Sequence, residues 1–185
     1  MKNTYLTSHF PLFSILLFST ALAMYSQSVI ITKLDDLGLY QGMMEFFSES
    51  GIKGTLLFLL LLFFFMVFSA LKLISDTMVQ LSLLFFSKDE EGVSLTTIRS
   101  GSWIYLIASV AALLGSTFIE VIVGVFLVAT LIYFVFFVYK ISDSLSALGL
   151  FGVVFFHTFF WFSFVLAISF AVLRLYNSFM ASLPL

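Results

Sequence analysis

Charged residues along this chain are separated by long windows that contain no Asp, Glu, Lys or Arg. These windows cover residues 3–32, 54–71, 100–119, 121–139 and 144–173. As a helix that rises about 1.5 Å per residue, each window is about long enough to cross the roughly 30 Å hydrocarbon core of a bilayer. The pattern therefore predicts five transmembrane helices, over about 10–32, 53–75, 101–118, 121–140 and 147–173.

The third and fourth windows are separated only by Glu120. A single helix from Gly101 to Lys140 would be about 60 Å long, which is twice the thickness of the hydrocarbon core. We therefore predict a tight helical hairpin with Gly115, Ser116, Thr117 and Glu120 near its turn. Glu120 is then expected at a membrane surface.

The connections between the predicted spans contain two further apolar segments. In residues 33–53, one helical face gathers the side chains of Leu39, Met43, Phe46 and Phe47. This predicts a short amphipathic helix that lies in the membrane interface or caps the bundle, with a substrate gate as the alternative. The second span is expected to continue to about Phe86, before a solvated turn at residues 88–92.

The first predicted span also has features of a secretory signal peptide. Lys2, the apolar residues 10–18 and the small residues Ala21 and Ala23 fit a signal sequence with a cleavage site. The apolar run nevertheless continues to Thr32, which is longer than a signal peptide requires. We therefore favour an uncleaved first helix, and cleavage would leave four spans.

Composition agrees with an all-α polytopic membrane bundle with short interfacial helices, forming a single transmembrane domain over residues 1–185. Hydrophobic residues make up 62% of the chain and charged residues 10%, against about 45–50% and about 25% in soluble domains. The 26 Phe residues are best accommodated against lipid, the expected partner. The net charge is −2, and the sequence has no cluster of Lys and Arg of the kind that nucleic-acid binding requires. Cysteine is absent, which removes disulfides and thiolate metal sites.

The distribution of Lys and Arg predicts the orientation of the five spans. One side would hold Lys2, Lys72, Lys88, Arg99 and Lys140, and the other side would hold Lys33, Lys53 and Arg174. Because cytoplasmic loops carry the excess of basic residues, we expect a cytoplasmic N-terminus and an external C-terminus, in a plasma membrane.

Four polar residues are candidates for an intramembrane site. Lys72 and Asp76 are four positions apart and therefore share a helix face. They could form an ion relay inside the membrane, but we favour a surface ion pair at the end of the span. His157 lies near the middle of the fifth span, where an interhelical hydrogen bond is favoured over proton coupling. Gln27 belongs to a polar stretch of the first helix and could line a small cavity or join two helices.

The third predicted span has the spacing of a closely packed helix. Ala108 and Ala112 stand in small-xxx-small register, and so do Ala111 and Gly115. Small side chains allow two helix backbones to approach closely in a membrane. We expect this helix to be central to the bundle.

No motif in the sequence identifies a reaction. Metalloprotease, nucleophile-elbow and phosphate-binding motifs are absent, and two histidines cannot form a His-rich metal site. We therefore expect no enzyme activity, no metal and no cofactor. The favoured function is a non-enzymatic bundle that acts by association, as a homo-oligomer or as an accessory subunit of another membrane protein. The alternatives are a small transporter or channel for protons, ions or an amphipathic solute, and lipid binding.

Three stretches of the chain carry a family resemblance. The segments LLFLLLLFFFMVFSALKLISDT, LSLLFFSKDEEG and IRSGSWIY resemble the YufK-like family of small Bacillus membrane proteins. This likeness covers about the middle quarter of the chain. Its more specific segments are SALKLISDT and FFSKDEEG. The resemblance implies the plasma membrane of a Gram-positive bacterium. It gives no catalytic residue to carry over.

Overall fold

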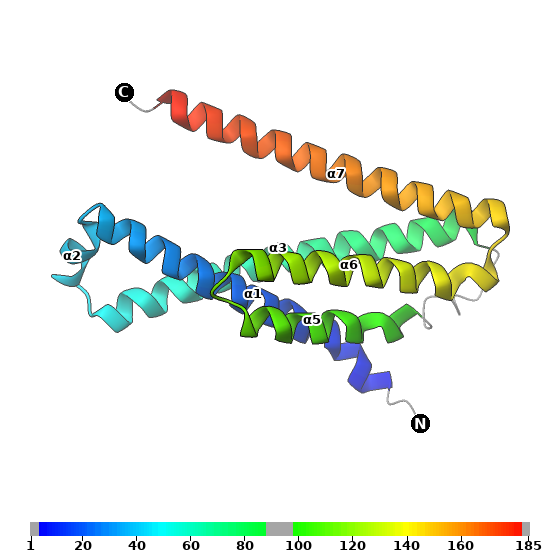
Figure 1. Cartoon of the computed structure of the whole chain (residues 1–185), viewed down its shortest axis with the longest axis horizontal. Coiled ribbons are helices and arrows are strands. Elements are labelled where there is room, and N and C mark those ends of the chain that lie inside the picture. The colour runs from blue at the N-terminus through cyan, green and yellow to red at the C-terminus, as the bar shows by residue number, and fades with distance from the viewer. Residues whose placement is uncertain (1–3, 88–97, 183–185) are drawn as a thin grey trace.

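Long helices account for nearly all of the structure, a computed structural model that describes residues 4–87 and 98–182 (Figure 1). Within those ranges no β-strand is present, which confirms the all-α fold class. The elements are α1 (Thr4–Asp36), α2 (Leu39–Met44), α3 (Glu49–Phe86), η1 (Arg99–Gly101), α5 (Ser102–Leu114), α6 (Ile119–Ile141), η2 (Ser142–Ser144) and α7 (Ala147–Ser182).

Four of these helices are long and apolar enough to cross a membrane. They correspond to Ser8–Asp36, Glu49–Phe86, Ile119–Ser144 and Ala147–Ser182. The remaining predicted span, residues 101–118, is a shorter apolar helix that covers Arg99–Leu114. The prediction of five helices is therefore approximate, with four full-length spans and one short helix in the described residues. The turn predicted at residues 88–92 lies outside those residues.

Helices α1, α3, α5, α6 and α7 run in alternating directions along one axis of the molecule (Figure 1). The end of α1, the start of α3, the α5–α6 turn and the end of α7 lie toward one end of that axis. The hairpin predicted between α5 and α6 is confirmed. It is closed by hydrogen bonds from Gly115 N to Ala111 O (3.0 Å) and from Phe118 N to Gly115 O (3.1 Å). Glu120 lies in the first turn of α6.

The main core is formed where α1, α5 and α6 meet. Its buried residues are mostly small or aromatic: Phe18, Ala21, Ala108, Ala112, Ile122 and Ala129. The ring of Phe18 lies 5.6 Å from that of Phe68 on α3 and 5.4 Å from that of Phe126 on α6, and the last two rings are 5.4 Å apart. These three rings therefore mark one level of the bundle.

The possible signal cleavage site lies inside this core. Residues 21 to 23 are within the continuous helix α1, and the side chains of Ala21 and Ala23 are fully buried. The small residues that resemble a cleavage motif thus have a packing role in the folded chain. An uncleaved first helix stays a prediction.

A second core joins the ends of α3 and α6 to the start of α7. Its buried residues are Val79, Leu83, Ile98, Phe137, Ile141 and Val153. Gly149 and Gly152 permit the close approach of α7, because a Cβ on Gly152 would stand 2.4 Å from the Phe86 ring and one on Gly149 would stand 2.9 Å from the Phe86 carbonyl oxygen. The predicted extension of α3 to Phe86 is confirmed.

The C-terminal half of α7 leaves the bundle. Every residue from 165 to 182 is exposed, and these residues include Leu166, Phe170, Leu173 and Phe179. In Figure 1 this part of α7 diverges from the other helices toward the C-terminus. The fifth predicted span is therefore packed within the chain only over residues 147–164.

The connection between α1 and α3 contains the short helix predicted within residues 33–53. Gly38, at the N-cap of α2, has a φ of 70°, a left-handed conformation that glycine adopts without strain. Leu39, Phe46 and Phe47 are exposed while Tyr40 is buried. Helix α3 then begins after Ser48, whose hydroxyl oxygen accepts a hydrogen bond from Gly51 N.

Candidate functional site

Lys72 and Asp76 form an ion pair one turn apart on α3, as their spacing predicts. Their side chains are 41% and 49% exposed, respectively, so the pair lies on the surface of the chain. The ring of Tyr133 on α6 lies 5.4 Å from that of Tyr105 on α5, whose hydroxyl donates a hydrogen bond of 3.3 Å to Thr130 Oγ1. Tyr105, Thr130 and Tyr133 therefore form a small polar cluster between α5 and α6.

The same face of α3 carries two more polar side chains. Ser69 and Gln80 stand three positions before Lys72 and four after Asp76, so these four residues follow one side of the helix. Gln80 is exposed and Ser69 is half-buried. We refer to Ser69, Lys72, Asp76 and Gln80 as the α3 polar face. The spacing of all four residues could have been read from the sequence.

His157 is buried at the contact between α6 and α7, only 4% exposed. Its imidazole Nδ1 lies 3.1 Å from the carbonyl oxygen of Val153 on the same helix, consistent with an Nδ1–H donor. The Nε2 atom has no hydrogen-bond partner among the described residues. Rings from Phe137 and Phe134 lie 5.1 and 5.9 Å from the imidazole. The histidine is therefore enclosed by aromatic side chains and makes no side-chain bond to another helix.

Gln27 joins two helices. Its Nε2 donates a hydrogen bond of 2.6 Å to the backbone carbonyl oxygen of Lys53 on α3. Lys53 itself forms an ion pair with Glu49 one turn earlier. Gln27 was expected either to line a small cavity or to join two helices, and this hydrogen bond agrees with the second role.

The small residues of α5 divide between its two sides. Ala108 and Ala112 are buried against α1 and α6, as expected for a packed helix. Ala111 is exposed. A Cβ on Gly115 would stand 2.5 Å from Val121 Cγ1, so glycine allows the tight α5–α6 turn.

The four polar candidates do not converge on one cavity. Two of the open depressions on the described surface lie between α1 and α3, around Leu16, Phe58 and Phe65, and along α7. Neither includes Lys72, Asp76, His157 or Gln27. Within residues 4–87 and 98–182, no three His, Asp or Glu side chains gather where they could hold a metal ion.

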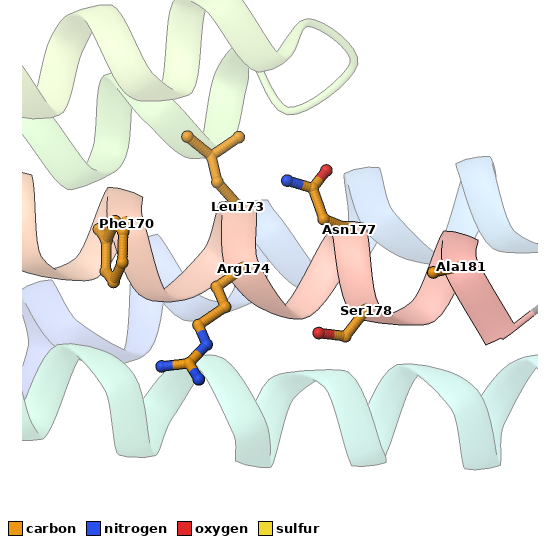
Figure 2. A pocket seen from close by; sticks show the side chains of 6 residues that line it. All are labelled: Phe170, Leu173, Arg174, Asn177, Ser178 and Ala181. Carbon is orange, nitrogen blue, oxygen red and sulfur yellow. The ribbon is translucent and has the colours of Figure 1, made fainter.

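The depression along α7 exposes polar groups on the C-terminal half of that helix. Figure 2 shows Arg174 and Ser178 pointing to one side of α7 and Leu173 and Asn177 to the other. All of its lining residues belong to α7 itself. It is thus an open helix surface and not an enclosed site.

Comparison with known proteins gives a family but no activity. The chain is 47% identical over 184 residues to the uncharacterized membrane protein YufK of Bacillus subtilis (strain 168), and the match covers 100% of both chains. No solved structure matches. Residues 27–184 match the family of unknown function DUF5366. The chain is therefore a membrane protein that belongs to the DUF5366 family.

Proposed function

We propose that this chain acts by association within the membrane, as a non-enzymatic helical bundle that assembles with itself or with another membrane protein. The observation that carries this proposal is the C-terminal half of α7, where every residue from 165 to 182 is exposed. Arg174, Asn177 and Ser178 interrupt its apolar surface. Polar side chains on membrane helices commonly hydrogen-bond to neighbouring helices, so this surface suits contact with another protein.

A transport path is supported less well by the same residues. Such a path needs polar groups that follow one another through the bundle. Lys72–Asp76 lies on the outside of α3, Gln27 binds the backbone of α3, and His157 is enclosed by phenylalanine rings. Because these groups occupy separate places, association is the better-supported function.

For the setting, we propose the plasma membrane with the N-terminus cytoplasmic and the C-terminus outside. The basis is the excess of Lys and Arg on the side predicted to hold the N-terminus, the 72–100 connection and the 140–146 connection, five residues against three. Because the chain contains no cysteine, single cysteines at Thr117 and Ser142 would report the two sides separately. In intact cells, a membrane-impermeant maleimide should label Thr117→Cys and spare Ser142→Cys. The reverse pattern would contradict this orientation.

The association proposal is tested by crosslinking in living cells. A photo-crosslinking amino acid at the exposed position Ala171 should give discrete protein adducts. The same substitution at Val153, which is fully buried, should give no intermolecular adduct and serves as the matched control on the same helix. Lipid adducts alone at Ala171 and at the other exposed positions of α7 would contradict the proposal.

A further inference from the structure

Helices α6 and α7 share one level where Phe137 meets His157, whose rings lie 5.1 Å apart. Ile141 and Val153, one turn away on either helix, belong to one buried cluster and repeat this register. The two helices run in opposite directions, so the start of α6 and the end of α7 lie toward the same end of the bundle (Figure 1). Equal numbers of residues counted back along α6 and forward along α7 therefore reach equal levels.

Glu120 and Arg174 stand at the same level by this count. Glu120 is 17 positions before Phe137, and Arg174 is 17 positions after His157. At a rise of about 1.5 Å per residue, each lies about 25 Å from the shared contact, close to the level of the α5–α6 turn. Because α7 diverges from the other helices over this distance, the equal level does not bring the two side chains together within one chain (Figure 1).

The charges of Glu120 and Arg174 have no partner among the described residues. Both side chains are exposed, and neither forms an ion pair there, whereas Lys33, Lys53 and Lys72 each pair with a carboxylate on their own helix. Helix α7 offers Arg174 no such partner, since residues 147–182 contain no Asp or Glu. Charged groups on membrane helices are costly unless they are paired. A partner from outside the chain would satisfy both.

The side chain of Arg174 points away from the α5–α6 turn of its own chain. Figure 2 shows it on the side of α7 opposite that turn, whereas Leu173 and Asn177 lie on the side toward it. Ala171 and Ser178 stand three positions before and four positions after Arg174, so its neighbours on this face are small. Small side chains let another helix approach closely in a membrane. The face therefore suits a helix from outside the chain.

We propose that α7 of one copy packs against α6 of a second copy, so that Arg174 of each copy pairs with Glu120 of the other. A two-fold axis along the membrane normal relates two copies of the same orientation and keeps every residue at its own level. Because the two charges share a level on different helices, this axis can place each opposite the other. A lipid phosphate would satisfy Arg174 but repel Glu120, whereas a second copy satisfies both. This inference rests on the proposed function of association and names its partner.

The test measures association of full-length chains in phosphatidylcholine–phosphatidylglycerol vesicles by energy transfer between copies. Labels attached through Ser142→Cys lie beyond the far end of α6, and the chain has no other cysteine. Glu120→Arg and Arg174→Glu should each weaken self-association by about tenfold or more, because like charges then face each other. An equimolar mixture of the two variants should restore association, since both contacts between unlike copies then join opposite charges. That recovery also shows that both variants fold.

Lys140→Glu, a charge reversal at the opposite end of α6, is the matched control and should leave association unchanged. If the double variant Glu120→Arg/Arg174→Glu associates but the mixture does not, the pair forms within one chain and the inference is overturned. If neither single variant weakens association, the assignment of these two charges is overturned while association stands. If the wild type is monomeric in vesicles yet forms adducts with other proteins through Ala171, the second copy is overturned and a different protein is the partner. Absence of both signals would overturn both proposals.

Discussion

The two halves of α7 have similar apolar character but different surroundings. Residues 147–164 contain Gly149, Gly152 and Val153, and they pack against Phe86 and Phe137. Residues 165–182 contain no glycine and contact no other helix closely enough to be buried. In a membrane, apolar composition does not itself drive helix contact, because lipid tails are equally apolar. The comparison shows that close backbone approach, and not hydrophobicity, determines where α7 joins the bundle.

The largest contrast is expected between a packed and a free phenylalanine. Phe18→Ala should lower the free energy of unfolding by about 3–5 kcal/mol, because a cavity forms between α1, α3 and α6. Phe170→Ala, at a side chain that is 68% exposed, should change it by less than about 0.5 kcal/mol. Thermal unfolding in detergent micelles, followed by circular dichroism, measures both. Equal losses would mean that the second half of α7 packs within the chain.

The contact at Gly152 can be broken directly. Gly152→Val should cost about 1–2 kcal/mol, because its side chain would enter the space of the Phe86 ring. The same change at Gly124, where a Cβ meets nothing within 4 Å, is the control and should be neutral or slightly stabilising. Energy transfer between labels on α3 and α7 should fall only in the Gly152 variant. An unchanged stability of that variant would show that Phe86 moves aside without cost.

Replacement of His157 tests how the first half of α7 packs against the bundle. His157→Phe removes the buried Nε2 that has no partner among the described residues, and it places a ring among Phe134, Phe137 and Phe156. We expect stability to rise by about 1 kcal/mol. His157→Asn, which keeps a polar group there, should not stabilise the chain. A loss of stability in the Phe variant alone would indicate that Nε2 has a partner in the assembled protein.

The smallest effect is expected where α1 and α3 meet beyond the main core. Gln27→Ala should cost about 1 kcal/mol through the lost hydrogen bond to Lys53 O. Gln27→Glu removes the donor and should cost at least as much, while Gln41→Ala, at an exposed pair with Asp35, should be neutral. Amide exchange at the start of α3 would rise in the Gln27 variants. No change there would show that other contacts hold the two helices together.

Sequence reasoning predicted the positions of the helices better than the contacts between them. The hairpin turn at Gly115–Glu120 followed from the length of residues 101–140, because hydrocarbon thickness limits a helix directly. The extension of α3 to Phe86 followed from the apolar residues after Asp76. The register between Phe68 and Phe126 could not be predicted, since many phenylalanines offer similar surfaces. That register decides which side chains of α3 and α6 meet.

The short α5 helix has a consequence for the lipid around it. Arg99–Leu114 reaches only about 24 Å along the bundle, whereas α6 reaches about 34 Å. Ile107 and Leu114 on α5 nevertheless face outward and require acyl chains beside them. A bilayer of uniform thickness cannot match both helices, so it must be compressed by several Å along α5. This hydrophobic mismatch favours thin, fluid regions of the membrane and makes chain length of the surrounding lipids a determinant of where the protein accumulates.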